Sequence, residues 1–256
     1  MTAKKKLLVV LVALVALVAT VVASVMGTIA YLTASAAVSN VFTVGNVQIT
    51  MDETKVKPDG TPDTNATGRV DTNSYHLVPG KKYLKDPTIH VNTGSENSYL
   101  FVLVRNDLAA IGPDAQSSYM TIAEQMEYLG WELYTSAATG SVYVYCGNAA
   151  GNEEQTVAGV DGKTFRTSNT STAWKAATPT VAGESYKLFE YFYTNNDIKD
   201  LSTYGAAKIT LTAVAIQITG FAGEVGSQES VTAAWKAVLE TYPYIYTGNT
   251  NSTPSN

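Results

Sequence analysis

Cysteine is almost absent from this chain, which has one, Cys146, among its 256 residues. A single cysteine cannot form a disulfide within the chain, so small folds that depend on disulfides are excluded. The fold must therefore be stabilised by packing or by assembly with other chains.

Histidine is nearly as rare, with only His76 and His90, and no H-E-x-x-H pattern or comparable set of zinc ligands occurs. Cys-His-Asn arrangements, the G-x-S-x-G elbow, phosphate loops and dinucleotide motifs are also missing. The sequence thus predicts no catalytic residue, no metal ligand and no cofactor. We expect His90 in a strand, His76 in a loop, and Cys146 as a partly buried, unreactive thiol.

The chain also lacks an excess of positive charge, with 17 basic against 22 acidic residues. Three of the lysines are Lys4–Lys6, so residues 31–256 carry 14 basic and 22 acidic residues, a net charge of −8. Because nucleic acids are bound mainly through basic contacts to phosphate, they are not expected partners.

The most prominent feature is a hydrophobic run from Leu7 to Met26, in which 18 of 20 residues are apolar. Lysines before such a run are typical of an export signal whose N-terminus stays inside. As a helix of about 1.5 Å per residue the run is about 30 Å long, which is enough for a membrane anchor. Small residues at Thr28 and Ala30 favour cleavage before Tyr31. We expect residues 1–30 to be a cleaved signal helix, with a retained anchor as the alternative.

Beyond residue 30 the pattern indicates strands. Phe42 and Val44 have one parity and Val47 and Ile49 the other, which predicts one bent strand over 38–51 with a bulge at Gly45-Asn46. The apolar run 99–104 predicts a central strand, paired with a strand at 88–91. Further strands are expected at 132–134, 141–145, 186–193 and 207–218.

Two segments have helical spacing. The first spans 117–130, with Ser117 or Ser118 as its cap and Gly130 at its end. The second spans 228–240, is capped by Ser227, and is expected to close one end of the sandwich.

Residues 52–74 are polar and predict a long surface loop. Five of them have carboxylate or amide oxygens that could bind calcium: Asp59, Asp63, Asn65, Asp71 and Asn73. Their spacing matches no known calcium loop, so calcium binding stays an open question. The sequence as a whole predicts a mainly β protein. It would consist of the signal helix, one antiparallel β-sandwich over 31–246 with two short peripheral helices, and a flexible tail over 247–256.

Several segments occur in an order found in one known family. Together they cover most of the chain: Gly27-Thr-Ile-Ala-Tyr-Leu-Thr33 after the hydrophobic run, Asn40-Val-Phe-Thr-Val-Gly-Asn-Val-Gln-Ile49, Leu77-Val-Pro-Gly-Lys81, Gly130-Trp131, Leu188-Phe189, and Ala213-Val-Ala-Ile-Gln-Ile-Thr-Gly-Phe221 before Ala234-Trp235. On these segments the chain resembles the TasA/camelysin family of proteins with SipW-dependent signal peptides. Loop 52–74 and the Thr/Asn-rich tail are not family features.

The resemblance implies secretion to the cell surface of a Gram-positive bacterium and cleavage after Ala30 by a dedicated SipW-type signal peptidase. It also implies a jelly-roll sandwich that polymerises into biofilm-matrix or surface fibres by donating its N-terminal strand. The donor residues would be Val38, Phe42, Val44, Val47 and Ile49, within residues 31–50. The expected partners are other copies of the chain and the signal peptidase, with a minor co-assembling matrix protein as an open addition. Contact with a membrane would be limited to the N-terminal segment before cleavage.

Two other functions stay open at this point. A monomeric surface adhesin or carbohydrate-binding protein could use some of the 16 tyrosines as a binding face. A surface metalloprotease is implied by the camelysin resemblance alone, since no zinc ligand set is present. We expect a protein that is not an enzyme.

Overall fold

The computed structural model describes residues 33–34, 39–44, 46–137, 140–147, 157–158, 164–165, 176–243 and 245. The expected signal helix over 1–30 and the tail over 247–256 lie outside this part of the chain. Within the described residues, no helix has the length and apolar character needed to cross a membrane.

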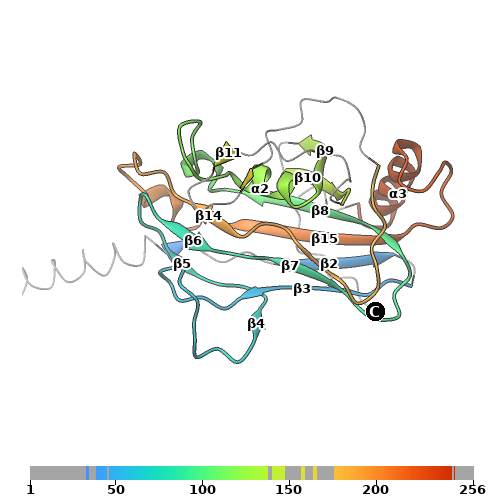
Figure 1. The fold of residues 1–256 in the computed structure, drawn as a ribbon, viewed down its shortest axis with the longest axis horizontal. Coiled ribbons are helices and arrows are strands. Elements are labelled where there is room, and N and C mark those ends of the chain that lie inside the picture. Colours follow the sequence, from blue (N-terminus) through green and yellow to red (C-terminus); the bar gives the residue numbers. More distant parts are fainter. Residues whose placement is uncertain are drawn as a thin grey trace, which may run out of the picture.

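The described chain is mainly β, with two sheets packed face to face (Figure 1). The five-stranded sheet has the order β2 (Ser39–Val44), β15 (Ile209–Gln217), β8 (Ser98–Asn106), β10 (Gly140–Tyr145) and β9 (Trp131–Ala137). The four-stranded sheet has the order β13 (Ser185–Lys187), β7 (Thr88–Val91), β3 (Ile49–Thr54) and β4 (Arg69–Val70). Every pair in these sheets is antiparallel except β2 with β15, which is parallel.

Short ladders complete the described strands. They pair β1 (Thr33–Ala34) with β5 (Tyr75–His76), β6 (Lys82–Leu84) with β14 (Tyr191–Tyr193), and β11 (Val157–Ala158) with β12 (Thr164–Phe165). Two 3-10 turns, η1 (Ala109–Ile111) and η2 (Ser202–Tyr204), follow β8 and β14.

The apolar side chains form two clusters, one on each face of the five-stranded sheet. The inner cluster lies between the sheets, where Val102 and Ala213 pack with Met51 and Ile89. The outer cluster joins Phe101 and Val214 to the helix α3 (Gln228–Thr241). Strand β8 is therefore buried on both faces, which confirms the central strand predicted from the run 99–104.

Helix α3 begins where the sequence predicts, with the Ser227 side chain accepting a hydrogen bond from the Ser230 N–H. Its apolar stripe, which includes Val231, Trp235 and Val238, packs on the outer face of the five-stranded sheet. The expectation that this helix closes one end of the sandwich is wrong, because the odd-numbered residues of β8 give that outer face an apolar surface for the helix to cover.

Helix α2 (Ile122–Tyr128) is shorter than predicted and starts later. Its cap is Thr121, not Ser117 or Ser118, because Thr121 and Glu124 satisfy each other's backbone N–H groups in a capping box. Gly130 ends the helix as predicted, with φ of +90°. A side chain there would also collide with the backbone of Gly147, since a Cβ would lie 2.8 Å from its carbonyl carbon.

Three strand predictions need correction. The single bent strand expected over 38–51 is two strands, β2 and β3, which lie in different sheets. The strands at 88–91 and 99–104 do not pair with each other, because β7 joins the four-stranded sheet and β8 the five-stranded sheet. The segment 186–193 is divided between β13 and β14.

Loop 52–74 is more closely tied to the sandwich than its composition indicates. β3 extends into it as far as Thr54, and Glu53, Val56 and Asn73 are buried. The Asn73 amide holds both ends of the segment, since it accepts from the Val56 N–H and donates to the Thr54 carbonyl. The remainder, from Lys57 to Thr72, is mostly exposed.

Candidate functional site

The candidate assembly site is the edge of the five-stranded sheet, where β2 lies beside β15. Six consecutive residues of β2 face six of β15 in parallel register, from Ser39 opposite Leu211 to Val44 opposite Ile216. Phe42 faces Val214, so the two paired strands come from segments about 170 positions apart in the sequence. An N-terminal segment and the last of the described strands therefore meet at this edge.

Strand β15 has the burial of an interior strand. Leu211 and Ala213 face the inner cluster, Val214 and Ile216 face the outer cluster, and each of the four is at most 1% exposed. Its second neighbour is β8, to which it is paired along its whole length. If β2 were absent, β15 would present an apolar edge with unpaired backbone groups, and such an edge pairs readily with another strand.

The chain between β2 and β3 is fixed to the body of the sandwich just after Gly45. The Asn46 carbonyl accepts from the Glu96 N–H at 3.0 Å, and the Gln48 carbonyl accepts from the Asn92 N–H at 2.8 Å. Val47 and Ile49 are buried in the inner cluster. A displacement of β2 from β15 can therefore hinge before Asn46 without disturbing β3.

The structure does not bring the predicted donor residues together on one strand. Phe42 and Val44 are in β2 of the five-stranded sheet, whereas Val47 precedes β3 and Ile49 lies within it. Val38 lies outside the described residues, as do Thr28, Ala30 and Tyr31 of the predicted cleavage site. The change of parity between Val44 and Val47 predicts a bulge, but it marks the change of sheet between β2 and β3. Either arrangement reverses the parity of the inward-facing residues, so the pattern alone does not distinguish them.

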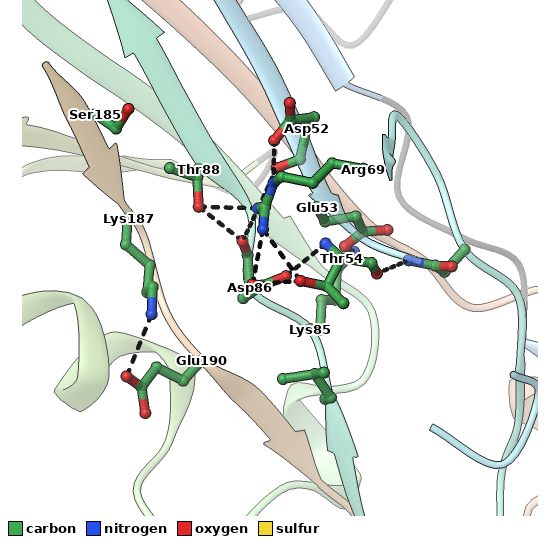
Figure 2. A network of polar contacts seen from close by, with 12 residues as sticks. Asp52, Glu53, Thr54, Arg69, Lys85, Asp86, Thr88, Ser185, Lys187 and Glu190 are labelled. Atoms are coloured by element: carbon green, nitrogen blue, oxygen red, sulfur yellow. Dashed lines mark hydrogen bonds and ion pairs between the residues drawn. The ribbon is translucent and has the colours of Figure 1, made fainter. Parts of the chain in front are cut away.

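A polar network covers the outer face of the four-stranded sheet (Figure 2). At its centre is the Arg69 guanidinium, whose Nε lies 2.5 Å from Asp52 Oδ1 and whose Nη1 lies 3.0 Å from Asp86 Oδ2. The same guanidinium donates to the Thr54 and Thr88 hydroxyls. Arg69 thus attaches β4 to β3 and to the start of β7, which holds the base of loop 52–74 in place.

His90 connects this network to β13. Its Nε2 lies 2.9 Å from Asp52 Oδ1 and its Nδ1 lies 2.7 Å from the Ser185 hydroxyl. Burial raises the pKa of Asp52, but hydrogen bonds from Arg69 and His90 outweigh it and hold that pKa below its usual range. The sequence could not reveal this contact, since Asp52, His90 and Ser185 come from three separate segments.

An acid, a histidine and a serine in contact invite comparison with a nucleophilic triad. Such a site also needs N–H donors that point at the developing oxyanion. The nearby backbone N–H groups of Val181, Gly183 and Glu184 are already bonded, to the Tyr186 hydroxyl and to the carbonyls of Val91 and Val181. The arrangement therefore supports a clamp across β3, β7 and β13.

One ion pair is sealed inside the sandwich. Lys85 Nζ lies 2.5 Å from Glu53 Oε2, and both side chains are at most 3% exposed. Burial lowers the pKa of Lys85, while the Glu53 charge opposes that shift. Glu53 Oε1 has no hydrogen-bond partner among the described residues. Sequence patterns gave no sign of this pair, because a charged residue at an inward position of β3 breaks the alternation.

The other residues singled out from the sequence are dispersed. His76 lies in β5 and His90 in β7, so they belong to different sheets. Asp59 and Asp63 accept hydrogen bonds within their own turns, from Thr61 and Asn65. No group of three His, Cys, Asp or Glu that could hold a metal occurs in the described part of the chain. Cys146 is buried at the end of β10.

The comparisons with known proteins add no relative. No family model matches the chain, and neither a curated protein nor a solved structure matches it.

Proposed function

We propose that this protein is an exported, non-enzymatic subunit of an extracellular fibre, of the kind found in a biofilm matrix or on a Gram-positive cell surface. Cleavage after Ala30 by a dedicated signal peptidase frees the N-terminal segment. Each subunit then donates its β2 segment to β15 of the next. The two facing sheets are those of a jelly roll in this proposal, as the resemblance to the TasA/camelysin family implies.

The observation that carries the proposal is the parallel pairing of β2 with β15. An N-terminal strand at a sheet edge, followed by a fixed point at Asn46, can leave its own subunit and occupy the same position in a neighbour. The exchanged contacts are identical in the closed monomer and in the fibre, so the exchange requires no new interface at the strand itself. The donor segment in this proposal is 31–44, shorter than the 31–50 expected from the sequence, because Val47 and Ile49 belong to the core of their own subunit.

Electron microscopy of purified residues 31–256 tests assembly, and deletion of residues 31–44 tests the strand. We expect residues 31–256 to form fibres. We expect the deletion variant to form none while its circular dichroism spectrum shows that it is still folded. A first protein that stays monomeric contradicts the fibre function, and unchanged fibres from the deletion contradict strand donation.

A cross-linking experiment shows which copy supplies the strand. Asn40 and Thr212 are register partners, so Asn40→Cys and Thr212→Cys are introduced into separate proteins, both carrying Cys146→Ser. Assembly of the two proteins together should give disulfide-linked dimers on a non-reducing gel. Thr50→Cys mixed with Thr212→Cys is the control, since Thr50 lies in the other sheet. Fibres from the mixture that contain no linked dimers would show that β2 stays with its own subunit.

A further inference from the structure

A groove of about 770 Å³ is lined by residues of β8, β10, α2 and β14 and by the chain that follows β8. Its floor is formed by Val104, Tyr143 and Phe192, from β8, β10 and β14. One wall is the chain that follows β8, residues 105–113, and the other is the start of α2, residues 120–123. The volume lies within the range of about 300–1,000 Å³ that is usual for small-molecule sites.

Polar atoms without a partner in the described chain line this groove. Tyr143 is only 7% exposed. Its hydroxyl makes no hydrogen bond to the described residues, and the hydroxyl oxygen is accessible to solvent. Asn106 uses its Oδ1 to accept from the Leu108 N–H, which leaves its NH₂ group for a ligand. Asp107 uses one oxygen to accept from the Lys208 N–H and has a second available. Three residues that line the groove therefore each have a polar group without a hydrogen-bond partner among the described residues.

An aromatic ring stands beside these groups in a fixed orientation. Tyr193 lines the groove and stacks on Tyr119, with ring centroids 4.2 Å apart and planes inclined by 19°. A ring held in this way loses little conformational freedom when a ligand packs against it. Aromatic faces beside hydroxyl-binding groups suit a ligand with both apolar C–H faces and many hydroxyls.

The charges and the strand pairing of the groove narrow the class of ligand. Arg105 and Asp107 are the charged side chains that line it, so their charges balance, and Arg105 donates to the Ile245 carbonyl. Strands β8 and β10 are each paired on both sides, so a peptide cannot add to the five-stranded sheet at the groove. Strand β14 pairs with β6 alone among the described strands, so the peptide titrated below also tests addition at that strand. We propose that the groove binds a neutral oligosaccharide, with one sugar ring on Tyr193 and hydroxyls bonded to Tyr143, Asn106 and Asp107. The site is independent of strand donation.

Isothermal titration of the full chain, solubilised in a sugar-free detergent, tests this proposal with cellotetraose, chitotetraose and maltotetraose. Binding of at least one of them is expected, with Kd of about 1 mM or tighter. Tyr143→Phe removes one hydroxyl and should weaken binding about five-fold, and Tyr193→Ala should weaken it more. Tyr128→Phe and Tyr128→Ala are the matched controls, because Tyr128 is a partly exposed tyrosine of α2 that does not line the groove.

Two results would overturn the inference. One is that no sugar of the panel gives a heat of binding at millimolar concentration. The other is that the sugar binds the Tyr143 and Tyr193 variants as tightly as the unaltered protein. A peptide of residues 31–45 is titrated in parallel, and binding of that peptide in place of the sugars, lost in Tyr143→Phe, would assign the groove to another copy of the chain. None of these results depends on whether fibres form.

Discussion

The two sheets differ in what covers their outer faces. On the five-stranded sheet, Phe101 and Val214 lie beneath α3 and are at most 1% exposed. On the four-stranded sheet, the outward positions are Thr50, Asp52, His90 and Ser185, which are polar and accessible to solvent. The strands β8 and β15 of the first sheet are thus buried on both faces, whereas the second sheet is buried on one face.

This difference explains why the N-terminal strand belongs to the five-stranded sheet. A strand buried on both faces has only its edge left to expose, so loss of β2 would leave apolar β15 unprotected. In the four-stranded sheet the alternation of polar and apolar residues fixes the register, and both edge strands are short. Arg69 holds the edge strand β4, and the contact between His90 and Ser185 holds the edge strand β13. In the proposed fibre, strand exchange is therefore expected at the first sheet and not at the second.

The largest expected effect comes from Phe101→Ala, in the face that α3 covers. The Phe101 ring is fully buried, with its centroid 5.0 Å from that of Trp235. Truncation should lower the free energy of unfolding by about 3–5 kcal/mol, because it removes buried apolar surface and leaves a cavity. Urea denaturation followed by tryptophan fluorescence measures it.

Thr50→Ala is the matched change on the other outer face, since Thr50 is exposed. It should alter the free energy of unfolding by at most about 0.5 kcal/mol. Equal losses from the two variants would mean that the outer faces are not as different as the burial indicates.

The second prediction concerns the ion pair that lies between the sheets. Lys85→Met leaves the Glu53 carboxylate buried without a counter-charge and should cost about 3 kcal/mol. The double variant with Glu53→Met should recover most of that loss, because two apolar side chains replace two buried charges. A double-mutant cycle in urea gives the coupling, and a double variant no more stable than Lys85→Met would show that the pair has a positive role in folding.

The sequence predicted the parts of the fold that depend on local pattern. Three such features lie where they were expected: the continuous apolar run of β8, the period-2 run of β15 and the Ser227 cap of α3. Each of them depends only on residues that are close together in the sequence. The pairing of β7 with β3 and β13, the switch of sheet after Gly45 and the partners of Arg69 were not predictable. They depend on residues that are distant in the sequence, and alternation is the same whichever sheet a strand joins.

The third prediction tests the polar face with pH. The pKa of Asp52 is held below its ordinary value of 3.8 in the folded state, so the unfolded chain binds its proton first as the pH falls. This contribution to stability is complete above the unfolded pKa and is lost as the pH falls through the folded pKa. Asp52→Asn should therefore show a smaller acid-induced drop in its urea midpoint between about pH 5 and pH 2. The control is Asp71→Asn, at an exposed carboxylate for which the described residues provide no ion pair, and it should follow the unaltered protein.

The smallest effect is expected from Ser185→Ala, at the far end of the same clamp. The Ser185 hydroxyl contacts His90 at an exposed position, so its loss should change the free energy of unfolding by less than about 0.5 kcal/mol. The decisive measurement is reactivity: a fluorophosphonate probe should not label the unaltered protein, because the N–H groups of Val181, Gly183 and Glu184 already have carbonyl or hydroxyl partners. Labelling that disappears in both Ser185→Ala and His90→Ala would show instead that His90 activates the serine, and the four-stranded sheet would then be a reactive face.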